Sequence, residues 1–367
     1  MGHIVTEFVP MPREVYTDLM SVNNLLNLFG NRLRTLPILI LYLTDGCNSR
    51  CAMCDIWRSP RRNMAPEFID AVSGEIAALH TRWVVLSGGE AMQHPDWPNI
   101  AARLRREGAK VILLTNGLFL QKQAQDVINN VDEVVVSLDG GTAATYKAIR
   151  GVDAFQLVLD GIAAVRAGGV PVTTRTTVQQ ANFREIPQII DATKSVDATL
   201  ISFLSIDVAN PYAFGPRFAD GLAIPVINAH EPPAGALSLE EVAALSAIYE
   251  DVFVHYQNDF ERGLIAESPA KLRQMVRYFQ AVDGESSFPP VRCNAPHTSM
   301  VIEVDGTVRP CYFLPQTGKW KADTSLRDQI NSDAAVAMRK AYRNGERPEC
   351  ARCVCPLYKD ARALIRL

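Results

Sequence analysis

The sequence predicts an α/β fold built around a parallel sheet. Six apolar runs rich in β-branched residues recur along the first half of the chain, and helix-length segments separate them. Alternating strands and helices require crossover connections, which make the strands parallel. Near-continuous apolar strands suit a sheet that is buried on both faces. Six such units fit either a doubly wound sheet or an incomplete barrel, and in both folds ligands bind at the carboxyl ends of the strands.

Each element follows from this pattern in chain order. The predicted strands cover residues 37–43, 83–87, 110–114, 133–138, 171–178 and 199–206. The predicted helices, with apolar residues three and four apart, cover 66–80, 96–107, 118–130, 153–167 and 183–194. An amphipathic segment at 14–34 precedes the first strand. We expect this segment to pack on the barrel as a helix, in preference to a lipid surface or a partner helix.

The alternation of strands and helices stops after the sixth strand. Residues 209–236 are rich in Pro and Gly and are predicted to be loop. Ser238 and Glu241 form a capping-box pattern that predicts a helix over 239–257. A second helix is expected at 268–282. The expected parts are a helical extension at 1–35, the strand–helix domain at 36–208, a loop and helical linker at 209–290, and a cysteine-bearing domain at 291–367.

Composition is that of a soluble globular protein with a sizeable core. Hydrophobic residues make up 48% and charged residues 21% of the 367 residues, and the net charge is −3. This charge gives no electrostatic reason to expect nucleic acid or an anionic membrane as a partner. The longest apolar runs are far shorter than the roughly 20 residues of a membrane helix, and the start lacks a signal-peptide pattern. We expect a cytoplasmic protein, whose eight cysteines are metal ligands sooner than disulfides.

Three of these cysteines follow the first strand in the run C-N-S-R-C-A-M-C, as Cys47, Cys51 and Cys54. A zinc site closed by a distant histidine is one interpretation. However, the spacing C-x3-C-x2-C is uncommon for zinc and suits an iron–sulfur cube in which three thiolates hold three irons. The fourth iron is then open to a small ligand, as a catalytic metal centre requires.

This motif resembles the hallmark of the radical SAM superfamily. The resemblance implies an incomplete (β/α)6 TIM-like barrel and a 4Fe–4S cluster whose open iron binds S-adenosylmethionine. In that family, one electron from the cluster cleaves the sulfonium, and the 5′-deoxyadenosyl radical removes a hydrogen atom from substrate. It also implies a flavodoxin- or ferredoxin-type reductant. Met53 stands where the family often has an aromatic residue, and its backbone is expected to touch adenine.

Further matches to the family fall at the ends of later strands. The run S-G-G-E at 87–90 resembles the GGE motif, which implies that its residues hold the methionine amino group. Two glycines allow a backbone to approach a ligand closely. An ordinary strand-to-helix turn is the alternative for this run. T-N-G ends the third strand, S-L-D ends the fourth, and I-R-G at 149–151 carries an arginine expected to pair with the methionine carboxylate or to lie on a helix surface. The predicted cofactor contacts are Met53, Gly88, Gly89, Glu90, Asn116, Ser137, Asp139 and Arg150.

The C-terminal region carries the other five cysteines. The run S-M-V-I-E-V-D-G-T-V-R-P-C-Y-F predicts a hairpin that turns at Asp305-Gly306. The spacing from Cys293 through Gly306 to Cys311 resembles SPASM and twitch domains, which hold auxiliary 4Fe–4S clusters. With five cysteines, the chain is similar to the shorter twitch form with one cluster. The implied ligands are Cys293, Cys311, Cys350 and Cys353, with Cys355 as a spare thiol or in place of Cys353. Zinc on the same four cysteines is the alternative.

A cluster that is fully ligated by thiolates is suited to electron transfer. We therefore expect a radical SAM oxidoreductase that dehydrogenates or epimerises a small polyol or natural-product intermediate. Modification of a ribosomal peptide or a protein side chain is the alternative, although such relatives often carry a leader-binding domain longer than the segment before the first strand here. A non-catalytic metal-binding protein is the third hypothesis.

Candidate catalytic residues are Arg175, Asp207, Tyr212 and Cys355, chosen by position. Arg175 interrupts the otherwise buried pattern of the fifth strand. A buried arginine must be paired. It is therefore expected to be a cofactor ligand, a substrate ligand or half of a structural ion pair.

Overall fold

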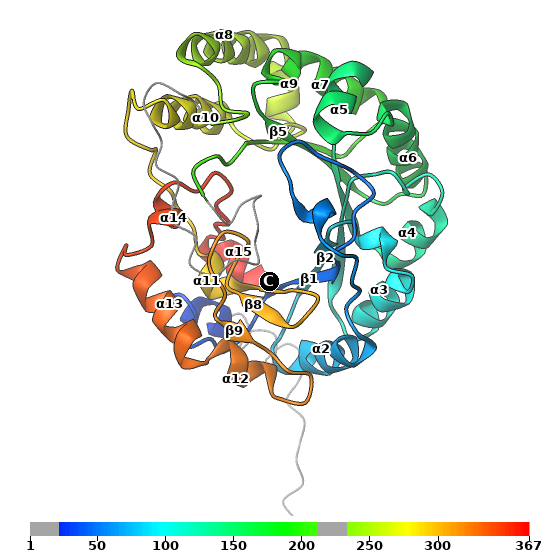
Figure 1. The fold of residues 1–367 in the computed structure, drawn as a ribbon, viewed down its shortest axis with the longest axis vertical. Helices are drawn as coiled ribbons and strands as arrows, with labels where there is room; N and C mark the ends of the chain where they lie inside the picture. Colours follow the sequence, from blue (N-terminus) through cyan, green and yellow to red (C-terminus); the bar gives the residue numbers. More distant parts are fainter. Residues whose placement is uncertain (1–21, 211–232, 367) are drawn as a thin grey trace, which may run out of the picture.

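The computed structural model describes residues 22–210 and 233–366. Within these residues, six parallel strands form a partial barrel with helices on its outside (Figure 1). Each strand pairs with the next one along the chain. The strands are β1 (Ile38–Thr44), β2 (Trp83–Gly88), β3 (Lys110–Thr115), β4 (Glu133–Ser137), β5 (Val172–Val178) and β6 (Leu200–Ser205). The predicted α/β fold with an incomplete barrel is therefore confirmed.

The helices between the strands bury apolar stripes against the outer face of the sheet. They are α2 (Pro66–Ala78), α3 (Trp97–Arg106), α4 (Ala124–Asn130), α5 (Ala143–Arg150), α6 (Phe155–Ala167) and α7 (Ile186–Ser195). Helix α4 begins six residues later than predicted, because Gly117, at a φ of 85°, starts a series of turns. Helix α5 was not predicted, although its ends carry clear signals: Thr142 caps the first turn and Gly151 ends the helix in the left-handed region.

After the barrel, α8 (Leu239–His255), α9 (Gln257–Glu261) and α10 (Pro269–Val282) pack beside β6. The predicted capping box is present, since the Ser238 and Glu241 side chains each accept a hydrogen bond from the other's backbone N–H. Of the predicted loop at 209–236, only 209, 210 and 233–236 are among the described residues. Likewise, 14–21 of the predicted N-terminal helix lie outside them; residues 22–26 are helical, and the helix does not continue to residue 34.

The C-terminal region continues the barrel's sheet. Strand β7 (Ser299–Ile302) pairs in parallel with β1, from Ile38 opposite Ser299 to Leu41 opposite Ile302. The predicted hairpin then brings β8 (Thr307–Arg309) antiparallel to β7, and β9 (Gly318–Lys319) follows at the edge. The remaining C-terminal helices are α11 (Ala295–Thr298), α12 (Leu326–Ile330), α13 (Asp333–Arg343), α14 (Pro348–Ala351) and α15 (Ala361–Arg366). Figure 1 shows α12 and α13 next to β8 and β9, where they continue the ring of helices.

The two faces of β1 separate the main core from the barrel interior. Leu39, Leu41 and Leu43 pack outward in the large core beneath the helices. Ile38, Ile40 and Tyr42 face inward and pack with the C-terminal hairpin. This alternation follows from the two-residue period of a strand. No helix within the described residues combines the length and apolar character that a membrane crossing needs.

Candidate active site

The cysteine loop that follows β1 is held in place by the end of α5. The Ser49 hydroxyl donates to the Arg150 carbonyl oxygen at 2.7 Å, and the Arg50 N–H donates to the same oxygen at 3.1 Å. The Ala52 N–H donates to the Ile149 carbonyl at 2.9 Å. A Cβ on Gly151 would lie 2.4 Å from the Arg50 carbonyl oxygen, so the close approach requires glycine. The I-R-G segment thus shapes the cysteine loop through its backbone.

Cys47, Cys51 and Cys54 line a cavity of about 660 Å³ at the carboxyl ends of the strands, here named the loop cavity. The Asn116 amide nitrogen lies 3.7 Å from the Cys47 sulfur, and the Ser49 hydroxyl lies 3.4 Å from that of Cys51. Burial raises the pKa of Cys47 to about 11 and also raises that of Cys54. Three thiols that line one roomy cavity fit a cluster in which each thiolate binds a different iron.

The S-G-G-E run packs its backbone directly on β1 and the start of the cysteine loop. The Gly89 N–H donates to the Thr44 carbonyl and the Glu90 N–H to the Gly46 carbonyl, both at 2.8 Å. A Cβ on Gly88 would lie 2.3 Å from the Thr44 oxygen, and one on Gly89 would lie 2.2 Å from the Gly46 oxygen. Both glycines line the loop cavity. Glycine is needed at these two positions first of all because the two backbones lie so close together.

Glu90 does not line the loop cavity. Its buried carboxylate accepts hydrogen bonds from the Thr115 hydroxyl at 2.9 Å and from the backbone N–H groups of Asn116 at 2.7 Å and Met92 at 3.1 Å. Burial raises the pKa of Glu90, and these three donors oppose the shift. In this structure Glu90 holds the end of β3, and with it Asn116, in position. The contact of Glu90 with a methionine amino group stays a prediction.

Arg150 and Asp139 form a buried ion pair, with Arg150 Nη1 3.0 Å from Asp139 Oδ2. Asp139 also accepts a hydrogen bond from the Thr177 backbone N–H at 2.7 Å. Burial raises the pKa of the Asp139 carboxyl, while the Arg150 charge lowers it. Arg150 lines the loop cavity, whereas Asp139 lies behind it. The helix-surface interpretation of Arg150 is therefore wrong, and Asp139 reaches the cavity only through its partner.

Most of the predicted cofactor contacts come together in the loop cavity. They are Met53, Gly88, Gly89, Asn116, Ser137 and Arg150. Other residues of the cavity wall were not predicted, and they include Tyr42, Ser87, Leu114, Thr115, Thr177 and Tyr312. Thr177 could have been found, because it lies two residues from Arg175 and so shares its strand face. Nothing in the sequence indicated that Tyr312 would reach the barrel.

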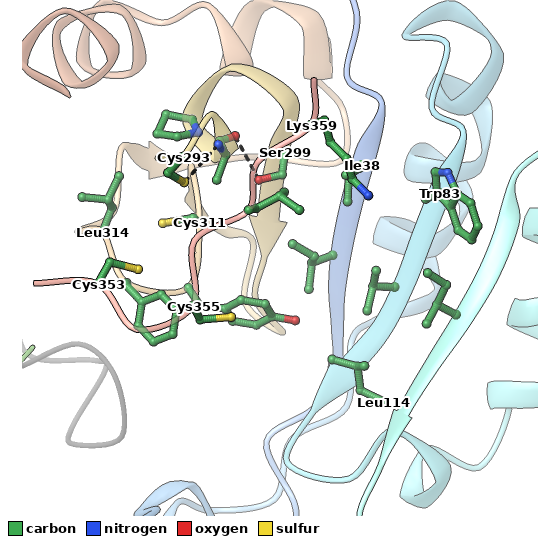
Figure 2. A pocket seen from close by; sticks show the side chains of 18 of the residues that line it. Ile38, Trp83, Leu114, Cys293, Ser299, Cys311, Leu314, Cys353, Cys355 and Lys359 are labelled. Carbon is green, nitrogen blue, oxygen red and sulfur yellow. Dashed lines mark hydrogen bonds between the residues drawn. The ribbon is translucent and has the colours of Figure 1, made fainter. Parts of the chain in front are cut away.

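All five C-terminal cysteines line a second cavity of about 370 Å³, here named the tail cavity. Figure 2 shows Cys293, Cys311, Cys353 and Cys355 facing Ile38 and Leu114 of the barrel strands across this space. Burial raises the pKa of every one of Cys293, Cys311, Cys350 and Cys353, to about 12 for Cys350. Cys355 lines the same wall, so position alone does not separate it from the four predicted ligands. Among the described residues, no three His, Cys, Asp or Glu side chains converge on a single metal ion.

The two cavities share Leu114 and Tyr312 as wall residues. Arg175 lines the tail cavity. Asp207 is buried, and its Oδ1 accepts the N–H groups of Ala209 and Asn210 at 3.0 Å each. Burial raises the pKa of Asp207 to about 7, against these two donors. Tyr212, the remaining candidate, lies outside the described residues.

A parallel partial barrel, a three-cysteine loop after its first strand and a cysteine-lined C-terminal hairpin define a class of iron–sulfur barrel proteins. Residues 41–192, the barrel part of the chain, match the radical SAM superfamily. Residues 293–354 match SPASM, an iron–sulfur cluster-binding domain. The predicted resemblance is therefore confirmed for both parts of the chain.

Curated relatives match a little under half of the chain. An AdoMet-dependent heme synthase from Methanosarcina barkeri is 32% identical over 176 residues, which cover 44% of this chain and 48% of the relative. A probable GTP 3′,8-cyclase from Saccharolobus islandicus is 30% identical over 178 residues, covering 47% of this chain and 58% of the relative. The chain thus spans about half the length of the curated relatives it matches.

Solved structures share the fold over more of the chain. SuiB from Streptococcus suis, bound to the precursor peptide SuiA, superposes with a TM-score of 0.64 over 98% of this chain and 80% of its own, at 14% identity. The protein anSMEcpe with bound AdoMet superposes with a TM-score of 0.60 over 81% of each chain, at 16% identity. At these identities the comparison establishes the fold alone.

Proposed function

We propose that this chain is an enzyme that reductively cleaves S-adenosylmethionine and takes a hydrogen atom from a small polyol or natural-product substrate. The net reaction is an oxidation or an epimerisation. One observation carries this proposal: Cys47, Cys51 and Cys54 share the loop cavity with the glycines, amide, hydroxyl and arginine that the family pattern assigns to the cofactor. A metal site with a purely structural role would need no such cavity beside its thiols.

The cavity wall suggests how the cofactor is held. The three thiolates bind the cluster, the Met53 backbone faces adenine, and Gly88 and Gly89 present their backbones to the amino group. Asn116 and Ser137 offer hydrogen bonds, and Arg150 offers a charge to the carboxylate. When bound, S-adenosylmethionine supplies a 5′-deoxyadenosyl radical once an electron from the cluster cleaves it. A flavodoxin- or ferredoxin-type protein is the proposed source of that electron.

The tail cavity suggests the route for a second electron. We assign an auxiliary 4Fe–4S cluster to Cys293, Cys311, Cys350 and Cys353, with Cys355 beside them. Such a cluster would accept the one electron that a substrate radical at an alcohol carbon must lose, together with its hydroxyl proton, to become a ketone. The shared wall residues Leu114 and Tyr312 support this route, because a substrate at that boundary would lie near both sets of thiolates.

A peptide side chain is the second candidate substrate. The solved structures with this fold include SuiB with a precursor peptide and anSMEcpe with a peptide. Deuterium transfer distinguishes the two candidates. Deuterated polyols and carboxylated intermediates should transfer deuterium into 5′-deoxyadenosine if the substrate is a small molecule. Transfer from deuterated peptides alone would replace the first candidate by the second.

The decisive test of the enzyme proposal is anaerobic reconstitution with iron and sulfide, followed by dithionite and S-adenosylmethionine. We expect 5′-deoxyadenosine, and an iron content of about eight per chain, since two cubes hold four irons each. Absence of 5′-deoxyadenosine from the iron-loaded protein would end the enzyme proposal and leave a metal-binding protein. About four irons with one zinc would remove the auxiliary cluster.

A further inference from the structure

Arg175 lies between the two cavities. On β5 it pairs in register with Ser137 of β4, which lines the loop cavity. Thr177, two residues further along the same face of β5, also lines the loop cavity. Arg175 itself lines the tail cavity. Arg175 therefore lies on β5 at the level where the loop cavity ends and the tail cavity begins.

Arg175 contacts no anion among the described residues. Its Nε is buried without a hydrogen-bond acceptor, and no described carboxylate forms an ion pair with it. The charge of Arg175 does act on Glu267. Burial raises the pKa of Glu267, and the Arg175 charge lowers it. That carboxylate is already engaged, because it accepts the Ser202 hydroxyl at 2.9 Å and the Phe203 N–H at 2.8 Å.

These observations decide between the three predicted roles of Arg175. A structural ion pair requires a contacting carboxylate, which the described residues do not provide. A cofactor ligand should line the loop cavity, which Arg175 does not. A guanidinium that faces a partly apolar cavity without a partner is costly unless a ligand neutralises it. The remaining role is that of a substrate ligand.

The other residues of the barrel wall indicate the polarity of the rest of that substrate. Between Arg175 and the amino ends of the strands the wall is mostly apolar. It holds Ile38, Ile40, Val85, Ile112, Leu114 and Val135, with Glu133 level with Ile112. The charged groups of the cavity other than Arg175 lie away from that residue. Glu133 begins β4, four residues and about 13 Å before Ser137. Lys359 lies near Ile38, away from Leu114 (Figure 2). Glu349 interacts with Arg347 beside the cysteines.

We propose that Arg175 binds the carboxylate of the substrate, and that the substrate is an organic acid with an apolar body rather than a neutral polyol. A guanidinium matches a carboxylate through two parallel hydrogen bonds. Arg175, with Lys359 lying away from it near Ile38, neutralises a monoanion and leaves one charge of a phosphate dianion uncompensated. This inference rests on the proposed function and narrows its substrate class.

The test is calorimetric titration of the anaerobically reconstituted protein with 4-phenylbutyrate and with 4-phenylbutanol, the neutral alcohol of the same carbon skeleton. A charge-assisted pair contributes about 1.5–3 kcal/mol, so we expect the acid to bind about 10- to 150-fold more tightly than the alcohol. Arg175→Met should abolish this preference and leave alcohol binding unchanged, and Arg175→Lys should retain part of it. Arg277→Met, on the exposed face of α10, is the matched control and should behave as the wild type.

Several results would overturn the assignment. They are equal binding of acid and alcohol by the wild type, no binding of the acid at 4-phenylbutyrate concentrations of about 10 mM, or an intact preference in Arg175→Met. The melting temperature gives an independent check, because removal of an unpaired cation should leave it unchanged or raise it. A clear fall with no change in ligand preference would indicate a structural role. Failure of the proposed function is separate, since it shows as absence of 5′-deoxyadenosine from the wild type.

Discussion

Tyr42 and Tyr312 pack against each other with ring centroids 6.0 Å apart and planes tilted by 36°. Tyr42 comes from the inner face of β1, and Tyr312 follows Cys311 in the C-terminal region. Both rings line the loop cavity, and Tyr312 also lines the tail cavity. The barrel and the SPASM region thus each contribute one ring of this pair to the wall of the loop cavity, and the Tyr312 ring extends to the tail cavity.

This contact should be measurable as a coupling energy. Aromatic pairs of this geometry contribute about 0.5–1.5 kcal/mol beyond their burial. We expect Tyr42→Leu and Tyr312→Leu to be non-additive by about 1 kcal/mol in a double-mutant cycle followed by urea denaturation. Strictly additive effects would mean that the two rings stabilise the protein independently.

The two sets of cysteines should lose iron separately. Cys47→Ala should lower the iron content from about eight to about four per chain and abolish 5′-deoxyadenosine formation. Cys311→Ala should lower the iron content by the same amount and leave cofactor cleavage measurable, because it lies outside the loop cavity. Cys355→Ala tests the fifth thiol and should keep all the iron if that thiol is spare. Normal cleavage in Cys47→Ala would exclude the proposed site.

Gly89 should not tolerate a side chain. Its Cβ would lie 2.2 Å from the Gly46 carbonyl oxygen, so β1 and the S-G-G-E turn would have to separate. We expect Gly89→Ala to destabilise the protein by on the order of 3 kcal/mol and to reduce iron binding by the loop cysteines. Gly74→Ala is the control. Gly74 lies within α2 with no neighbouring atom within 4 Å of a Cβ, and alanine there should stabilise by about 0.5–1 kcal/mol. Wild-type melting and iron content for Gly89→Ala would contradict the close approach.

Asp207 should make the protein less stable as the pH rises from about 4 to about 7. Burial raises its folded-state pKa to about 7, whereas the unfolded chain releases the proton near pH 4. Between these values the folded state holds the extra proton, so unfolding becomes easier with rising pH, by up to about 4 kcal/mol in total.

The matched variant for this prediction is Asp207→Asn, which keeps an acceptor for the Ala209 and Asn210 N–H groups. The difference in unfolding free energy between wild type and variant should change by several kcal/mol from pH 4.5 to 8, in favour of the variant at high pH. A difference that is constant over this range would mean that Asp207 ionises normally.

The strands and the cysteine loop were predictable because their signals are local. Each strand is a short apolar run, and Cys47, Cys51 and Cys54 lie within eight residues of one another. The hairpin at Asp305-Gly306 was predictable for the same reason. Its position beside β1 was not, because strand pairing between residues 38 and 299 is decided by the folded core.

Side-chain direction was the other limit of the sequence. Glu90 and Asp139 each lie two residues beyond the end of a strand, and both accept hydrogen bonds from donors away from the loop cavity. The donor for Asp139 is Arg150, which the sequence predicted as a separate cofactor contact. Two polar residues that satisfy each other look, in a sequence, the same as two that await a ligand.

The parallel pairing of β7 with β1 has a consequence for attempts to exchange parts between barrels of this family. The strand next to the cysteine loop has backbone hydrogen bonds on both sides, and one of those sides is supplied by the SPASM region. A shortened chain that ends before β7 would expose the edge of its most apolar strand, which invites pairing with other molecules. The C-terminal region is therefore not a detachable module. A graft of this region onto another barrel must keep a strand edge that pairs with the first strand of that barrel as β7 pairs with β1.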